Sequence, residues 1–125
     1  MNKVISMANR AALVASRTAG VRDRRYTIRY PFAADALLIH LESGEQITGV
    51  TSDISLGGCF ICTSKQFPKN SRARLRLSRK GQELECLVTV RIVKPRIGLG
   101  IEFFDLEPPN NTILANWIDS QRRNR

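Results

Sequence analysis

Strict alternation of apolar and polar residues is the feature that most constrains how this chain folds. Residues 72–77 read Arg-Ala-Arg-Leu-Arg-Leu, and after a Lys80-Gly81 turn apolar residues occupy every second position from Leu84 to Val90. A period of two residues is typical of β-strands with one buried face. The two runs predict an antiparallel hairpin whose apolar side chains share one face: Ala73, Leu75 and Leu77, then Leu84, Cys86, Val88 and Val90.

Four further strand-like runs surround this hairpin. The six predicted strands begin near Ala34, Glu45, Cys59, Arg72, Glu83 and Ile97 and are joined by short turns. Because no helical pattern separates them, a parallel sheet is not expected. Closing the sheet into a small barrel covers the apolar faces and removes exposed strand edges. We therefore predict an all-β fold, a six-stranded antiparallel β-barrel.

The two ends of the chain differ from this pattern. After Pro108-Pro109-Asn110-Asn111, apolar residues recur at helical spacing, which predicts a C-terminal helix over about 109–122. Trp117 lies on its apolar face and is expected to pack the helix onto the barrel. We assign residues 1–20 to an N-terminal extension that is flexible or forms a short helix, and residues 21–121 to the barrel domain with its helix.

The composition of the chain favours some classes of function over others. The chain has 125 residues and a formal net charge of +9, which favours anionic partners such as nucleotides, nucleic acid or acidic lipid. Its three cysteines argue against a disulfide framework, and Cys59 and Cys62 are expected on opposite faces of one strand. No metal site is predicted. The absence of a membrane-spanning run and the reduced thiols predict a cytoplasmic location.

A first candidate site motif is the arginine-rich segment before the barrel. Arg25 and Arg29 form the spacing R-x-x-x-R shortly before Pro31, so their segment is expected to be extended, with both side chains on one side. The arginine fork matches phosphate and the guanine edge bidentately. Together these residues form a candidate anion clamp on a basic arm. A solvated basic linker explains the run equally well when it is taken alone.

A second motif, D-x-S-x-x-G, follows at the end of the second predicted strand. Asp53 and Ser55 are expected to face the same way, the carboxylate accepting from guanine N–H groups and the hydroxyl donating to a phosphate or ribose oxygen. Gly57 and Gly58 allow a turn and close backbone approach. An ordinary turn between strands is the alternative reading of this motif on its own.

The two motifs are separated by 24 residues, from Arg29 to Asp53, and Gly98-Leu99-Gly100 follows near the end of the β-rich region. With this combination, the chain resembles the PilZ domain family over roughly residues 22–119. The resemblance implies a six-stranded barrel with a C-terminal helix and a receptor for cyclic di-GMP. It implies that Arg25 and Arg29 grip guanine and phosphate, while Asp53, Ser55, Gly57 and Gly58 line the barrel surface under the ligand.

The residue before the R-x-x-x-R spacing is Arg24. An arginine at this point resembles family members that bind two intercalated copies of the ligand. The resemblance also implies a switch without catalysis or a cofactor, in which the N-terminal arm folds over the barrel on binding and signals to an unidentified downstream protein. Motility, exopolysaccharide synthesis, biofilm formation and virulence control are the outputs that it allows.

Three alternatives compete with this hypothesis. An enzyme is not expected. His40, the one histidine, is expected on the outer face of its strand, and no catalytic motif accompanies it. A nucleic-acid-binding barrel fits the charge and the basic stripe of Arg72, Arg74 and Arg76, although few aromatic residues are available for base stacking. That stripe equally suits docking to an acidic partner protein. A scaffold without ligand binding is disfavoured because every motif residue is present.

Overall fold

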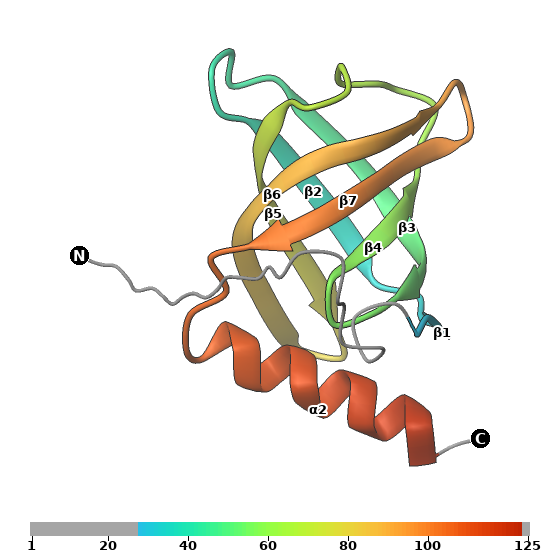
Figure 1. Ribbon diagram of the computed structural model, residues 1–125, viewed down its shortest axis with the longest axis vertical. Coiled ribbons are helices and arrows are strands. Elements are labelled where there is room, and N and C mark those ends of the chain that lie inside the picture. The colour runs from blue at the N-terminus through green and yellow to red at the C-terminus, as the bar shows by residue number, and fades with distance from the viewer. Residues whose placement is uncertain (1–27, 124–125) are drawn as a thin grey trace, which may run out of the picture.

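The computed structural model describes residues 28–123. It contains seven strands and one helix in chain order: β1 (Tyr30–Pro31), β2 (Asp35–His40), β3 (Gln46–Ile54), β4 (Gly58–Cys62), β5 (Arg72–Arg79), β6 (Gln82–Lys94), β7 (Gly98–Phe104) and α2 (Asn110–Arg123). All strand pairs are antiparallel, and Figure 1 shows them wound into a barrel with α2 across one end. The predicted all-β fold with a C-terminal helix is confirmed.

Six strands close the barrel. Their order is β3-β2-β5-β6-β7-β4, and a further pairing of β4 with β3 completes the circle. The two-residue β1 is an addition that pairs with the last residues of β3, Tyr30 with Ile54 and Pro31 with Asp53. Closure leaves both sides of each barrel strand hydrogen-bonded, which removes the open edges of a flat sheet.

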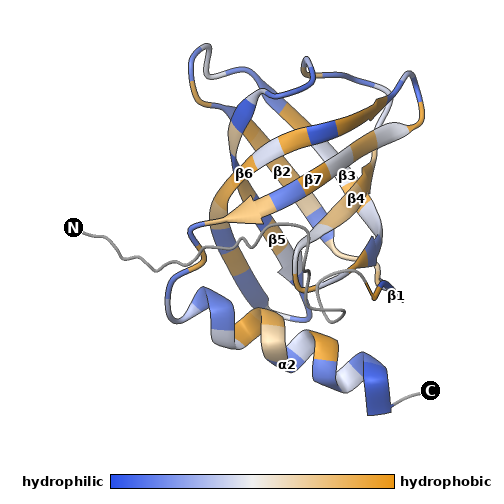
Figure 2. Cartoon of the chain, in the orientation of Figure 1, coloured by the Kyte–Doolittle hydropathy of each residue, from blue (hydrophilic) through white to orange (hydrophobic). Residues whose placement is uncertain are grey.

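The core follows the predicted alternation. In β5 the residues Ala73, Leu75 and Leu77 are fully buried while the arginines between them face solvent. Leu84, Cys86, Val88 and Val90 of β6 face the same interior. The β5–β6 turn has positive φ at both Lys80 and Gly81, as in a type I′ hairpin, which glycine adopts without strain. Figure 2 shows the resulting mixture of apolar and polar positions along each strand.

The helix closes one end of the barrel. Leu114, Trp117 and Ile118 are its buried residues, and the Trp117 ring lies 5.1 Å from that of Phe32. The indole N–H donates to Gln82 Oε1 at 3.1 Å, so Trp117 packs the helix onto the barrel as predicted. Asn110, the first helical residue, accepts the backbone N–H of Glu85 at 2.9 Å and ties the start of α2 to β6.

Two expectations about single side chains have different outcomes. Cys59 is buried and Cys62 exposed, so the C-x-x-C pair does lie on opposite faces of β4. His40 was expected on the outer face, and this is wrong. It pairs with the buried Ala73, and its ring meets the buried Phe67 edge-on at 5.1 Å, because β2 turns Ala36, Leu38 and His40 inward. Residues 28–123 include no helix with the length and hydropathy to cross a bilayer.

Candidate functional site

The two predicted motifs meet at the outer wall of the barrel. The Arg29 guanidinium contacts the Asp53 carboxylate through Nη1 and Oδ1, across 24 positions of sequence. Pro31 pairs with Asp53, so β1 holds the segment that follows Arg29 against the end of β3. The side chains of Arg29 and Asp53 remain 47% and 29% exposed, which leaves both open to a ligand. Arg24 and Arg25 lie outside the described residues.

A bulge in β3 aims Asp53 outward. Thr51 is buried and pairs with Ile61 of β4, whereas Asp53 pairs with Phe60, so one extra residue, Ser52, interrupts the register. Regular alternation from Thr51 would direct Asp53 into the core. The extra residue reverses its direction, as bulges do where a strand must re-aim a side chain. The other Asp53 oxygen, Oδ2, accepts a hydrogen bond from the Ser52 hydroxyl at 3.1 Å.

Ser55 does not face the same way as Asp53, and that expectation is wrong. Strand β3 ends at Ile54, and Ser55 is 3% exposed at the start of the β3–β4 turn. Its hydroxyl accepts the backbone N–H groups of Gly57 at 3.2 Å and Gly58 at 3.1 Å, and donates to the Gly58 carbonyl at 3.3 Å. The hydroxyl therefore shapes the turn beside Asp53 instead of facing solvent. A buried N–H without such a partner is costly.

The glycines of the motif bring β4 and β7 together. A Cβ atom at Gly58 would lie 2.0 Å from the carbonyl oxygen of Ile101, so no other residue fits without moving backbone. The Gly57 carbonyl accepts the Phe103 N–H at 2.9 Å and links the turn to β7. The prediction that this pair permits close backbone approach is met at Gly58.

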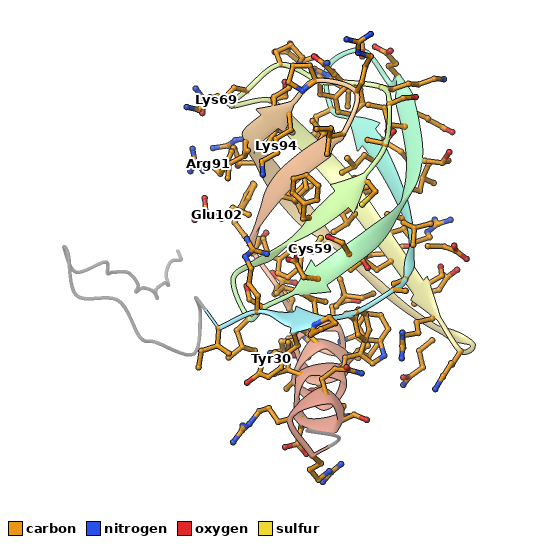
Figure 3. The ribbon with its side chains drawn as sticks, turned by 90° about the vertical axis from the view of Figure 1, so that its right-hand side faces the viewer. Tyr30, Cys59, Lys69, Arg91, Lys94 and Glu102 are labelled. Atoms are coloured by element: carbon orange, nitrogen blue, oxygen red, sulfur yellow. The ribbon has the colours of Figure 1, made fainter. Side chains whose placement is uncertain are left out.

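The wall next to Asp53 contains residues that the sequence interpretation missed. Phe60 of β4 pairs with both Asp53 and Gly100, and its ring covers Gly98, where a Cβ would lie 2.5 Å from the ring. Because Gly98 and Gly100 leave the outer face of this part of β7 without side chains, Lys94 of β6 reaches across it to within 5.5 Å of the Phe60 ring centroid. Figure 3 shows Lys94 on the same side of the barrel as Arg91 and Glu102. The sequence signal that could have indicated this part of the wall is the pair of glycines two residues apart in one strand, Gly98 and Gly100.

This arrangement suits a ligand that has both hydrogen-bond donors and negative charge. Asp53 offers carboxylate oxygens, Arg29 offers a planar donor fork, and Lys94 adds a cation above an aromatic ring. The site is an open wall, so a ligand would bind on its surface. Among the described residues, no group of three or more potential metal ligands is placed to hold a metal ion.

Buried thiols behind the wall take no part in such binding. Burial raises the pKa of the Cys59 thiol far above its ordinary value, and the neighbouring Cys86 and Asp53 act in the same direction. Burial, with a smaller effect from Asp105, raises the pKa of Cys86 to about 12. Both groups remain neutral thiols at physiological pH and serve as small apolar core residues.

Comparisons with known proteins bear on the family and the fold. The sequence model of the PilZ domain matches residues 23–120. No curated protein matches the chain. Several solved structures share its fold. The PilZ domain of CeSA from a cellulose-synthesizing bacterium has a TM-score of 0.61 and 18% identity, over 76% of this chain and 98% of that one.

Two further neighbours are longer proteins. The Bacillus subtilis inhibitor of motility MotI/DgrA has a TM-score of 0.66 and 17% identity, and the match covers 84% of this chain and 53% of that one. Escherichia coli YcgR, in a complex with c-di-GMP, has a TM-score of 0.62 and 18% identity, and the match covers 83% of this chain and 48% of that one. This chain therefore spans about half of each of these two proteins.

Proposed function

The chain belongs to the PilZ domain family, and we propose on this basis that it is a receptor for cyclic di-GMP. The observation that supports the proposal best is the contact between Arg29 and Asp53, which joins the two motif halves on one solvent-facing wall. A small ligand that touches both halves must bind where they meet. The solved complex of YcgR with c-di-GMP shows that a protein with this fold holds that ligand.

Each motif residue has a distinct role in the proposal. Arg29 and Arg25 bind the phosphates and a guanine edge through their donor forks, and Asp53 accepts from guanine N–H groups. Ser55, Gly57 and Gly58 act on the ligand through the turn that they shape next to Asp53. Arg24 supports a second, intercalated copy of the nucleotide, because a third arginine supplies a further planar cation for stacking and charge compensation.

Binding and switching share one step in this proposal. Without ligand, Arg29 and Asp53 satisfy each other. An exposed ion pair of this kind contributes less than about 1 kcal/mol, so a ligand that engages both side chains replaces it at low cost. Arg24 and Arg25 then close on the ligand beside Arg29. The changed position of this arm presents a new surface to a downstream protein, and the chain acts as an adaptor and not as an enzyme.

Titration calorimetry with cyclic di-GMP tests the receptor assignment. We expect Arg29→Ala and Arg25→Ala each to weaken binding about tenfold to a hundredfold, since a charge-assisted hydrogen bond contributes about 1.5–3 kcal/mol. Arg76→Ala is the matched control, because Arg76 is a similarly exposed arginine that pairs with Glu85 on β6, away from Asp53. Wild-type affinity in Arg25→Ala and Arg29→Ala would refute the assignment.

The same titration tests the ligand count and the competing function. Two nucleotides per chain are expected, and a stoichiometry of one would count against the role given to Arg24. GMP and a single-stranded oligonucleotide should compete poorly. Steep salt dependence with little preference among these ligands would instead favour a nucleic-acid-binding barrel.

A further inference from the structure

A second surface of the barrel combines arginines with apolar side chains. On the outer face of β5, Arg74 pairs with Ile39 of β2 on one side and with Leu87 of β6 on the other, and Leu87 pairs with Phe104 of β7. Arg72 lies one step along β5, beside Leu41. We call these six residues the arginine patch: Ile39, Leu41, Arg72, Arg74, Leu87 and Phe104.

The positive charge of the arginine patch has no carboxylate partner within residues 28–123. Arg76, the next outward residue of β5, is paired with Glu85 at 2.9 Å, and Glu102 at the opposite border is paired with Arg91 at 2.6 Å. Arg72 instead lies over the Phe104 ring, 4.9 Å from its centroid. The unpaired charge is therefore confined to two arginines two residues apart, in the middle of half-buried or exposed apolar side chains.

The apolar neighbours indicate what kind of molecule fits. Leu41 is 45% exposed, and Ile39, Leu87 and Phe104 are partly exposed, so a partner that covers them gains by removing apolar area from water. Strand β5 is hydrogen-bonded to β2 and β6 on both sides, which excludes binding by strand addition. The partner must therefore dock through side chains.

We propose that the arginine patch is a docking site for an acidic amphipathic helix of a partner protein. Alternate residues of a strand are about 6.8 Å apart, and carboxylates four residues apart on a helix are separated by about 6 Å. Two such carboxylates can pair with Arg72 and Arg74 while apolar residues on the same helix face cover Leu41, Leu87 and Ile39. The site is separate from the Arg29–Asp53 wall and does not depend on cyclic di-GMP.

Charge argues against the other occupants. Residues 1–27 contain six Lys and Arg against the single Asp23, so this segment would be repelled from two unpaired arginines. A second copy of a chain with net charge +9 meets the same repulsion. Two cations are fewer than the roughly four to eight of a basic cluster that binds anionic lipid. Nucleic acid would leave the aliphatic residues of the patch uncovered. Arg72 already covers the Phe104 ring, the one aromatic ring of the patch, so this ring is not open to base stacking.

Fluorescence anisotropy with a designed peptide tests the docking site. The probe is a labelled helix of about 16 residues with two glutamates four residues apart and leucines on the same face. We expect Arg72→Glu/Arg74→Glu to weaken its binding about tenfold or more, and to bind a probe with lysines in place of those glutamates better than the wild type does. Such an exchange of preference is not produced by a general loss of structure.

The matched control is Lys65→Glu/Lys69→Glu, which changes the net charge equally at two exposed residues of the β4–β5 loop. It should leave peptide binding nearly unchanged. Equal loss in this control, equal binding of a glutamine-substituted probe, or no binding by the wild type would overturn the proposal. Tighter binding of phosphatidylglycerol vesicles or of a single-stranded oligonucleotide, lost in Arg72→Glu/Arg74→Glu, would also overturn it. If the charge reversal does not fold, Arg72→Gln/Arg74→Gln should bind the glutamate probe and the glutamine-substituted probe equally, whereas the wild type prefers the glutamate probe.

Discussion

Arginines stand on two walls of this barrel in different settings. On the β3–β4–β7 wall, Arg29 contacts a carboxylate that a bulge has turned outward, next to a turn held by the buried Ser55 hydroxyl. On the β2–β5–β6 wall, Arg72 and Arg74 lie on a regular strand, with aliphatic neighbours and no carboxylate partner among the described residues. The first wall is irregular and internally satisfied; the second is regular and charged.

The difference suits the two kinds of binding that we propose. A small ligand needs a few polar groups at fixed positions, and the first wall fixes them through a bulge, a side-chain-capped turn and glycines in close backbone contact. A protein partner needs a broader surface, which ordinary strand alternation supplies without special backbone geometry. Substitutions on each wall should show how far it depends on these backbone features.

The largest effect is expected at Gly58. Gly58→Ala places a Cβ atom 2.0 Å from the Ile101 carbonyl oxygen, so the β4 and β7 backbones must separate. We expect a loss of about 3 kcal/mol in the free energy of unfolding, measured with urea. Gly100→Ala on the same wall is the milder comparison, because its Cβ would lie 2.9 Å from the Ile92 Cβ and so requires a smaller shift than the 2.0 Å overlap at Gly58. Equal losses would show that backbone approach is not what Gly58 supplies.

A smaller loss is expected when the turn hydroxyl is removed. Ser55→Ala leaves the Gly57 and Gly58 N–H groups without their acceptor. Burying such groups unsatisfied should lower stability by about 2 kcal/mol. Ser43→Ala is the comparison, since the Ser43 hydroxyl accepts the Glu45 N–H at an exposed turn where water can replace it. If Ser55→Ala lowered the free energy of unfolding as little as Ser43→Ala does, the Ser55 hydroxyl would not be needed to satisfy these N–H groups.

Alkaline pH should weaken the core between the walls. The pKa of Cys86 is raised from 9.0 to about 12, so above pH 9 the unfolded chain releases this proton more readily than the folded one. The contribution of this thiol to the free energy of unfolding is therefore fully present below pH 9 and is lost as the pH rises from 9 toward 12. At pH 10 the loss from this thiol is about 1.4 kcal/mol. Urea midpoints from pH 8 to 10 should fall less steeply in Cys86→Val, and parallel slopes would contradict the assignment.

The smallest effect on stability is expected at the Arg29–Asp53 ion pair itself. Both side chains are partly exposed, so Arg29→Ala should cost less than about 1 kcal/mol. Arg76→Ala, which removes an exposed pair with Glu85, should cost about as much. The two variants should differ only in cyclic di-GMP affinity. A large loss of stability in Arg29→Ala alone would mean that this pair holds β1 in place and is not kept for a ligand.

Sequence patterns predicted the barrel well because its strands obey a simple period. The arginines of β5, the type I′ turn at Lys80-Gly81 and the packing of Trp117 all follow from local alternation and spacing. The same reasoning was wrong at Ser55, where the bulge at Ser52 and the end of β3 break the period. His40 was misplaced because both faces of β2 contain apolar residues, which leaves its inward face undefined in sequence.

Local patterns in the sequence were enough to place the strands along the chain, to assign the inward faces of β5 and β6, and to identify the motif residues. Three sets of contacts became visible only in the folded barrel: Arg29 meets Asp53, Lys94 reaches Phe60 across two glycines, and Arg72 and Arg74 have apolar neighbours from other strands. Alternation is a local property of one strand. Contacts across strands depend on register, bulges and barrel closure, which are fixed when all six strands pair at once.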